Sequence, residues 1–198
     1  MLRLMAVCTG NVCRSPLAEV LLRARLGDAA VEIVSAGVRA LAGHPMTPET
    51  AEIARENGAD EEQTAAHRAH QLDERLLDGT DLVLAMSREH RTGIVDVAPH
   101  LLRSTFTLRE FARLARPVSD AELTRLIGDA RGPRRRLQLV VEHLSEVRGT
   151  IGPPPSPADD DVPDPYRRGP EAYERSAAVL IPAVDETARV IRIVSRRL

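Results

Sequence analysis

A short apolar run at the start of the chain leads into Cys8-Thr9-Gly10-Asn11-Val12-Cys13-Arg14-Ser15, residues that could bind and attack a phosphate group. A loop between a strand and a helix points successive backbone N–H groups into one concavity, with the positive end of the helix behind it. Arg14 adds a planar guanidinium that can hold two phosphoryl oxygens at once, a geometry that lysine cannot match. The segment therefore predicts an anion site.

Cys8 lies at the floor of that concavity and is the candidate nucleophile. A free thiol has a pKa of roughly 8.5, which a helix N-terminus or a cationic neighbour lowers to roughly 3.5–7.5. The same electric field would therefore bind phosphate and generate a thiolate. Ser15 could donate a hydrogen bond to the sulfur and ease its departure. The alternative, an inert cysteine packed in the core, is disfavoured by its place in this loop.

Transfer of a phosphoryl group from a monoester also needs an acid for the leaving oxygen. The candidate is Asp164, in the turn Pro163-Asp164-Pro165-Tyr166; a residue of the run Asp159-Asp160-Asp161, or a purely structural turn aspartate, is the alternative. In the expected first step Cys8 attacks phosphorus while Asp164 protonates the leaving group. In the second step the Asp164 carboxylate activates water, which hydrolyses the cysteinyl phosphate. Arg14 and the loop amides would stabilise the charge in both steps.

These residues need a sheet that ends beneath the loop, and the hydrophobic pattern predicts one. Short apolar runs indicate strands at Leu2–Val7, Val31–Val34, Asp81–Met86 and Ser104–Thr107. Helical periodicity and capping residues predict helices at 15–26, 47–57, 72–77, 88–97, 108–114, 121–130, 134–147 and about 170–195. Strands that alternate with helices in this way predict an α/β fold with a parallel sheet and helices on both faces. In such sheets ligands bind beyond the carboxyl ends of the strands, where the Cys8 loop lies.

Composition excludes several classes of protein. The 198 residues suit one globular domain, and no apolar stretch approaches the roughly 18–20 residues of a membrane span. All 27 basic residues are arginine, so the lysine of a Walker A loop is absent. The formal net charge of −2 does not suit a protein that coats nucleic acid or an acidic membrane. The richness in alanine, arginine and proline favours a bacterial genome of high G+C content.

The cysteines indicate a chemical role and a reducing compartment. Cys8 and Cys13 share one loop, so they cannot staple distant parts of the fold, and they are too few for a thiolate-rich zinc site. His67 and His70 lie three residues apart but lack a third ligand nearby. We therefore expect a cytoplasmic protein with no metal and no cofactor.

The spacing of these motifs resembles one known family. Cys8, five further residues and then Arg14-Ser15-Pro16, with Asp164-Pro165-Tyr166 near the end of the chain, resemble the low-molecular-weight protein tyrosine phosphatases of bacteria. Ser35-Ala36-Gly37 and the strand at 81–86 are part of this resemblance. It extends over about 1–114 and 159–198.

The resemblance implies a four-stranded parallel sheet with helices on both sides, and no metal. It also implies that Cys8 is the nucleophile, Arg14 the phosphate clamp and Asp164 the acid and base. Cys13 would form a reversible disulfide with Cys8 under oxidation. Six residues of the loop would bind the substrate or shape the loop, namely Thr9, Gly10, Asn11, Val12, Cys13 and Ser15.

The substrate is a phosphorylated protein or a small phosphomonoester, and the sequence leaves this choice open. Tyr166 suits a flat substrate at the rim of the pocket, and Leu41 could form the opposite wall. In the family, relatives that act on phosphotyrosine often carry isoleucine at the position of Val12, and relatives that act on phosphoarginine carry threonine. Valine matches threonine in shape and isoleucine in polarity. We expect a protein tyrosine phosphatase, with an arginine phosphatase or a small-molecule phosphatase as the alternative.

Two other functions fit the loop less well. Thiol-coupled arsenate reductases share the fold but relay electrons through later cysteines, and this chain has none after Cys13. A non-catalytic phosphate-binding module would not need both Cys8 and Asp164.

One segment departs from the family pattern. About forty extra residues, at about 115–158, precede the Asp164 turn and combine two predicted helices with a proline-rich linker. We expect this insertion to belong to a single phosphatase domain over 1–198. A lid, an arm of a homodimer and a site for a partner are its three candidate roles.

Overall fold

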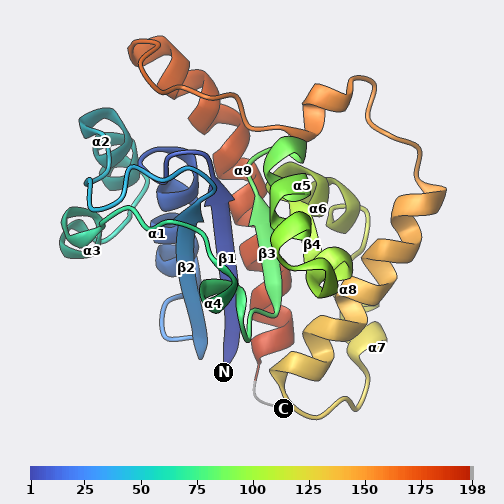
Figure 1. Cartoon of the computed structure of the whole chain (residues 1–198). Helices are drawn as coiled ribbons and strands as arrows, with labels where there is room; N and C mark the ends of the chain where they lie inside the picture. Colours follow the sequence, from blue (N-terminus) through green and yellow to red (C-terminus); the bar gives the residue numbers. More distant parts are fainter. Residues whose placement is uncertain (197–198) are drawn as a thin grey trace.

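A parallel sheet of four strands lies at the centre of the computed structural model, which describes residues 1–196 (Figure 1). The strands are β1 (Leu2–Cys8), β2 (Val31–Gly37), β3 (Leu82–Ala85) and β4 (Thr105–Thr107). They lie in the order β2-β1-β3-β4, and every pairing is parallel. This topology confirms the predicted α/β class and its parallel sheet. Two strands extend beyond the predicted ends, to Cys8 and to Gly37.

The run at the N-terminus forms β1 and is mostly apolar because the sheet is covered on both faces. Successive side chains of a strand point to opposite sides. Leu2 and Leu4 belong to one hydrophobic cluster, whereas Met5 and Val7 belong to the other. Because this central strand is buried on both sides, it is apolar without alternation from Leu4 to Cys8, and Arg3 near its start is only partly buried.

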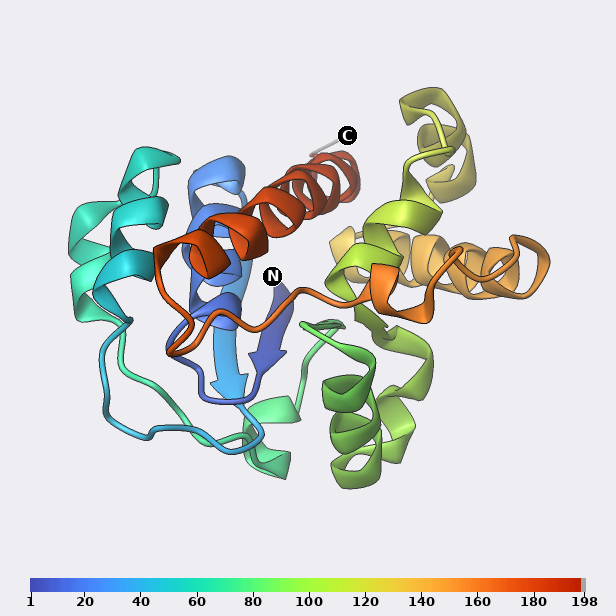
Figure 2. The same cartoon turned by 90° about the horizontal axis from the view of Figure 1, so that it is seen from above.

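Helices cover both faces of the sheet, as predicted. The α-helices are α1 (Arg14–Leu26), α2 (Pro48–Glu56), α3 (Glu61–Ala66), α4 (Glu74–Leu77), α5 (Arg88–Val97), α6 (Leu108–Ala115), α7 (Asp120–Ile127), α8 (Pro133–Thr150) and α9 (Pro170–Ser195). One cluster joins α1, α6 and α9 to the sheet, and the other joins α4 and α5 to its opposite face (Figure 2). Across residues 1–196, every helix is too short or too polar to span a bilayer.

Three short elements were not predicted from the sequence. They are α3 and the 3-10 helices η1 (Pro99–Ser104) and η2 (Pro157–Asp160). None of the three exceeds six residues, so none is long enough to show a helical period in its apolar residues.

The extra segment at about 115–158 contains α7, α8 and the proline-rich linker, and η2 begins at its end. Leu123 of α7 and Leu144 of α8 are buried in the same cluster as α6 and α9. The first turn of α8 lies beside the amino ends of the strands, because Arg134 forms an ion pair with Asp81 and a hydrogen bond with the Met1 carbonyl. This is the edge of the sheet opposite to the Cys8 loop (Figure 1), so α7 and the start of α8 do not cover that loop.

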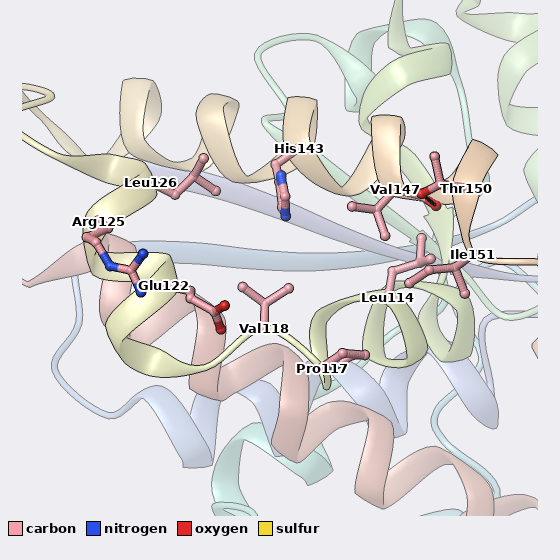
Figure 3. A pocket seen from close by; sticks show the side chains of 10 residues that line it. All are labelled: Leu114, Pro117, Val118, Glu122, Arg125, Leu126, His143, Val147, Thr150 and Ile151. Atoms are coloured by element: carbon pink, nitrogen blue, oxygen red, sulfur yellow. Dashed lines mark hydrogen bonds between the residues drawn. The ribbon is translucent and has the colours of Figure 1, made fainter.

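A groove of about 590 Å³ runs between α8 on one side and α7 and the end of α6 on the other (Figure 3). Its walls are mostly apolar, and Arg125 and His143 point into it. No residue of the 8–15 loop lines this groove. The chemistry predicted for the loop therefore belongs to a second, smaller cavity at the carboxyl edge of the sheet.

Candidate active site

The loop between β1 and α1 takes its shape from Asn11, which is fully buried. Its backbone adopts a φ of 57°, a left-handed conformation that asparagine tolerates better than most residues. Its amide nitrogen donates hydrogen bonds to the hydroxyls of Ser15 and Ser35, at 2.9 and 2.8 Å. Its amide oxygen accepts a 2.8 Å hydrogen bond from the backbone N–H of His70. The side chain thus joins the loop to α1, to β2 and to the segment before α4.

The Cys8 sulfur lies at the end of β1 and accepts two hydrogen bonds. The backbone N–H of Asn11 donates at 3.3 Å, and the hydroxyl of Ser15 donates at 3.0 Å. Cys8 is 2% exposed and is not in a disulfide. Donors that converge on one sulfur stabilise negative charge there.

Arg14 begins α1 and is buried, with 6% exposure. Its Nη2 lies 2.9 Å from the Asp164 carboxylate, and its Nη1 donates to the Val162 carbonyl at 3.2 Å. Within residues 1–196 its Nε finds no hydrogen-bond partner. The N-terminus of α1 has neither a capping side chain nor an acidic residue in its first turn. Free N–H groups and a buried guanidinium together form a site for an anion.

Asp164 returns to the loop from the far end of the chain. The N–H of Val162 donates to the carbonyl of Met86 at 2.8 Å, which attaches this segment just beyond β3. The side chain of Asp164 is 42% exposed and also accepts a hydrogen bond from the Tyr166 N–H at 3.2 Å. The alternative acids lie elsewhere, since the carboxylates of Asp160 and Asp161 pair with Arg113 and Arg88.

These residues enclose a cavity of about 130 Å³. Its lining comprises Cys8, Thr9, Gly10, Val12, Cys13, Arg14, Arg39, Leu41, Asp164 and Tyr166. The structure thus brings together most of the residues that the sequence suggested. Asn11 and Ser15 do not line the cavity, and both side chains are fully buried, as residues that shape the loop would be.

Sequence reasoning missed Arg39, which lines the mouth of the cavity and is exposed. It lies there because residues 38–41 run along the loop, with backbone hydrogen bonds from Arg39 to Thr9 and from Leu41 to Gly10 at 3.0 and 2.9 Å. Only glycine at 37 permits this approach, since a Cβ there would lie 2.5 Å from the Thr9 carbonyl oxygen. The motif that ends in Gly37 was therefore the available signal for Arg39.

His90 is the second residue that sequence reasoning missed. Its ring lies between the hydroxyls of Thr9 and Ser87, at 2.8 Å from each. Burial and the positive charge of Arg14 lower the pKa of His90 to about 4, so the imidazole is neutral near pH 7. Ser87 caps α5 directly after β3, so it lies at the carboxyl end of a strand, where ligand sites form. That position was the signal in the sequence that could have identified His90.

Cys13 lies on the helix side of the cavity and packs against Tyr173 of α9. Its sulfur lies 3.7 Å from the Tyr173 hydroxyl and 3.7 Å from the Thr47 hydroxyl. Burial raises the pKa of the Cys13 thiol above its ordinary value. The thiol of Cys13 is therefore a weaker acid than an exposed cysteine.

The two histidines near α3 both contact Asn11 of the loop, His67 through its ring and His70 through its backbone N–H. The His67 ring bonds the carbonyl oxygen of Asn11 at 2.8 Å, and burial lowers the pKa of His67. Within the described part of the chain, no three His, Cys, Asp or Glu side chains gather as metal ligands would.

Comparison with known proteins decides the family. The model of the low molecular weight phosphotyrosine protein phosphatase family matches residues 3–122. This chain belongs to that family. A probable low molecular weight protein-tyrosine-phosphatase, EpsP of Ralstonia solanacearum, is 38% identical over 107 residues, which cover 54% of this phosphatase and 70% of the relative. A protein-arginine-phosphatase of Geobacillus stearothermophilus is 34% identical over 148 residues, which cover 73% and 94%.

Solved structures of the family share the fold of this phosphatase. The YwlE arginine phosphatase from Geobacillus stearothermophilus superposes with a TM-score of 0.64 at 29% identity, covering 95% of this chain and 91% of that one. A low molecular weight protein tyrosine phosphatase from T. tengcongensis superposes with a TM-score of 0.63 at 31% identity, covering 94% and 97%. The resemblance inferred from the motifs and the expected fold are both confirmed.

Proposed function

We propose that this phosphatase hydrolyses phosphomonoesters through a cysteinyl-phosphate intermediate on Cys8, with Arg14 as phosphate clamp and Asp164 as general acid and base. One observation carries the proposal. All three residues line the same cavity, and the Arg14 guanidinium lies 2.9 Å from the Asp164 carboxylate. A substrate phosphate bound to the same guanidinium would have its leaving oxygen beside that carboxylate.

In the first step the Cys8 thiolate attacks phosphorus, and the bond from phosphorus to the leaving oxygen breaks. The proton of Asp164 passes to that oxygen, so the product departs as a neutral alcohol or phenol. The free N–H groups at the start of α1 and the Arg14 guanidinium stabilise the charge on the other three oxygens.

In the second step water attacks the phosphorus of the cysteinyl phosphate, and Asp164, now a carboxylate, takes a proton from that water. The bond between sulfur and phosphorus breaks, inorganic phosphate leaves, and the thiolate returns. The hydroxyl of Ser15, 3.0 Å from the Cys8 sulfur, stabilises the departing charge.

The substrate that we propose is phosphotyrosine in proteins. Tyr166 and Leu41 give the small cavity apolar walls that suit a flat aryl ring. Phosphoarginine in proteins is the second candidate, because the protein-arginine-phosphatase of Geobacillus stearothermophilus matches over 94% of its length. Val12, which lines the cavity, is the position at which the two substrates would be distinguished.

A substrate panel tests this assignment. We expect the wild type to turn over p-nitrophenyl phosphate and a phosphotyrosine peptide at least ~10-fold faster than a phosphoarginine peptide. We expect Val12→Thr to reduce this preference for the aryl phosphates over the phosphoarginine peptide. A wild type that prefers the phosphoarginine peptide would show that the tyrosine assignment is wrong.

The roles of the two cysteines are separable. Cys8→Ser should abolish turnover of p-nitrophenyl phosphate while inorganic phosphate still binds, because the guanidinium and the loop N–H groups remain. Cys13→Ser keeps the nucleophile and should retain measurable turnover. Full activity of Cys8→Ser would refute the mechanism.

We also propose that residues 1–198 form one domain located in the cytoplasm. The core that α7 and α8 share with α6 and α9 supports a single domain. A mechanism that needs a reduced Cys8 supports a reducing compartment. A homodimer through the groove between α7 and α8 is part of the proposal, and the mass of the protein in solution tests it. A monomer at micromolar concentration would exclude that homodimer.

A further inference from the structure

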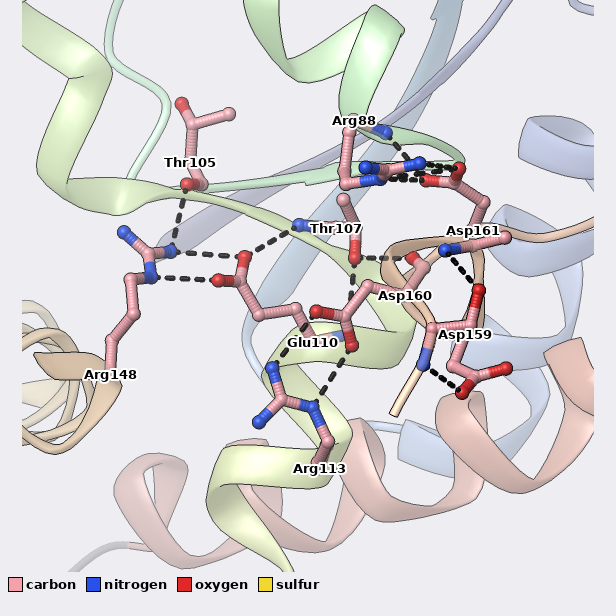
Figure 4. Close-up of polar contacts among 11 residues, drawn as sticks. Arg88, Thr105, Thr107, Glu110, Arg113, Arg148, Asp159, Asp160 and Asp161 are labelled. Carbon is pink, nitrogen blue, oxygen red and sulfur yellow. Dashed lines mark hydrogen bonds and ion pairs between the residues drawn. The ribbon is translucent and has the colours of Figure 1, made fainter. Parts of the chain in front are cut away.

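The acidic run before the Asp164 turn takes no part in the mechanism above, yet its first buried member is held tightly (Figure 4). Asp160 is 7% exposed, and Arg113 of α6 binds both of its carboxylate oxygens, with Nε at 3.0 Å and Nη2 at 2.9 Å. A bidentate pair of this kind sets orientation as well as distance. The carbonyl oxygen of Asp160 also accepts a 2.6 Å hydrogen bond from the hydroxyl of Thr107.

The next two residues are held by other elements. Arg88 of α5 donates its backbone N–H and its Nη2 to the Asp161 carboxylate, at 2.8 and 3.0 Å. Arg109 of α6 donates to the Asp161 carbonyl at 2.8 Å. Val162 is bonded to the carbonyl of Met86 at 2.8 Å. Three consecutive residues are therefore tied to α5, to α6 and to the end of β3.

Helix α8 of the insertion supports the same anchor from behind. Arg148 forms an ion pair with Glu110 at 2.8 Å, and its guanidinium lies 4.2 Å from the centre of the Phe106 ring. Glu110 in turn accepts a hydrogen bond from the backbone N–H of Thr107, the residue whose hydroxyl holds Asp160. Glu110 and Arg148 thus connect the insertion to the anchor of the acid loop (Figure 4).

Asp164 itself has few bonds that would fix it. It contacts Arg14, which a bound phosphate would also engage, and the N–H of Tyr166 in its own turn. With prolines at 163 and 165 restricting the backbone on both sides, the place of the carboxylate follows from the place of 160–162. A displacement of about 1 Å at a reacting group can cost about 100-fold in rate.

We propose that Arg113, Arg88 and Arg148 are positioning residues that hold Asp164 for proton transfer, so that the insertion acts on catalysis through Arg148. This inference rests on the role proposed above for Asp164. The alternative is that the network only stabilises the fold, in which case its loss would affect all substrates alike.

The leaving group of the substrate separates these two roles. Phenyl phosphate needs a proton on its leaving oxygen, whereas 2,4-dinitrophenyl phosphate releases a stable anion. We expect Arg113→Met to lower kcat/KM for phenyl phosphate by about 10- to 100-fold and for 2,4-dinitrophenyl phosphate by less than about 3-fold. Arg148→Met should show the same pattern at smaller amplitude. Arg116→Met, at the exposed residue that directly follows α6, is the matched control and should change neither rate.

The double variant with Asp164→Asn completes the test. Without the acid, Arg113→Met should add less than about 2-fold for either substrate, because it acts through Asp164. Arg88→Gln, at a side chain that is 51% exposed, serves if Arg113→Met does not fold. Equal losses on both substrates, or a full additional loss in the Asp164→Asn background, would overturn the proposal. If Asp164→Asn itself shows no dependence on the leaving group, the proposed acid is wrong instead.

Discussion

Replacing Asn11 by alanine would test whether this side chain shapes the phosphate loop. The substitution removes three hydrogen bonds of 2.8–2.9 Å, to Ser15, Ser35 and the backbone of His70. It also leaves an alanine at a φ of 57°. The change keeps the backbone N–H that donates to Cys8. It removes the side-chain hydrogen bonds that hold this N–H in its orientation.

The expected loss of stability follows from these contacts. Each hydrogen bond contributes about 1 kcal/mol net, so three contribute about 3 kcal/mol. The left-handed conformation costs most residues about 1–2 kcal/mol, and asparagine tolerates it better than alanine does, so the substitution by alanine adds about 1 kcal/mol of strain. Asn11→Ala should therefore lower the free energy of unfolding by about 4 kcal/mol, and Asn11→Gly, which avoids the strain, by about 3 kcal/mol.

Urea unfolding measures the loss of stability, and kcat/KM for p-nitrophenyl phosphate measures the loss of activity. We expect both variants to lose at least ~10-fold in kcat/KM, because the loop N–H groups no longer converge on one point. Asn57→Ala is the matched control; it removes one 2.8 Å hydrogen bond at the end of α2 and should keep full activity. A loss below about 1 kcal/mol with unchanged turnover in Asn11→Ala would refute the reasoning.

Three further predictions concern the same cavity. Gly37→Ala places a Cβ 2.5 Å from the Thr9 carbonyl, so urea unfolding should show a loss of about 1–3 kcal/mol with reduced turnover, while Gly149→Ala, which meets nothing within 4 Å, should lose no stability. The pKa of His90 is about 4 in the folded protein, below its ordinary value. As pH falls, the imidazole is therefore protonated in the unfolded chain before it is protonated in the folded one. Stability should therefore decline by up to about 3 kcal/mol between about pH 6.5 and pH 4, and His90→Gln should remove that part of the slope in urea unfolding. Arg39→Glu should lower kcat/KM about 5- to 10-fold for phosphotyrosine peptides with acidic neighbours, an effect that salt weakens, and should leave p-nitrophenyl phosphate within about 3-fold. An equal effect on both substrates would assign Arg39 to the phosphate itself.

The eight residues of the phosphate loop could be interpreted from the sequence because they are contiguous. A loop of fixed length between a buried strand and a helix leaves few arrangements for Cys8 and Arg14, and the helix N-terminus supplies the field. The same holds for β1, whose short, mostly apolar run predicted a strand that the structure contains. Asp164 was found by its turn chemistry, although it lies far away along the chain.

Asp160 and Asp161 show what the sequence could not decide. Three consecutive aspartates carry the same chemistry, and arginine is the basic residue everywhere in this chain. Which carboxylate meets Arg113 and which meets Arg88 depends on where α5 and α6 lie once both pack on the sheet. Local pattern contains no information on such a pairing, since it joins residues that are far apart in sequence.

Arg39, His90 and Arg148 were missed for the same reason. Each lies in a segment with its own plausible local role, as a loop residue, a helix surface or part of an inserted helix. Each acquires a partner only when the parallel sheet aligns the carboxyl ends of its strands, or when α8 packs beside β4 and α6. The sequence by itself thus determined the family, the fold class and the chemistry of the loop, which depend on neighbouring residues. Tertiary packing decided what surrounds and positions that chemistry, because those contacts exist only after distant segments meet.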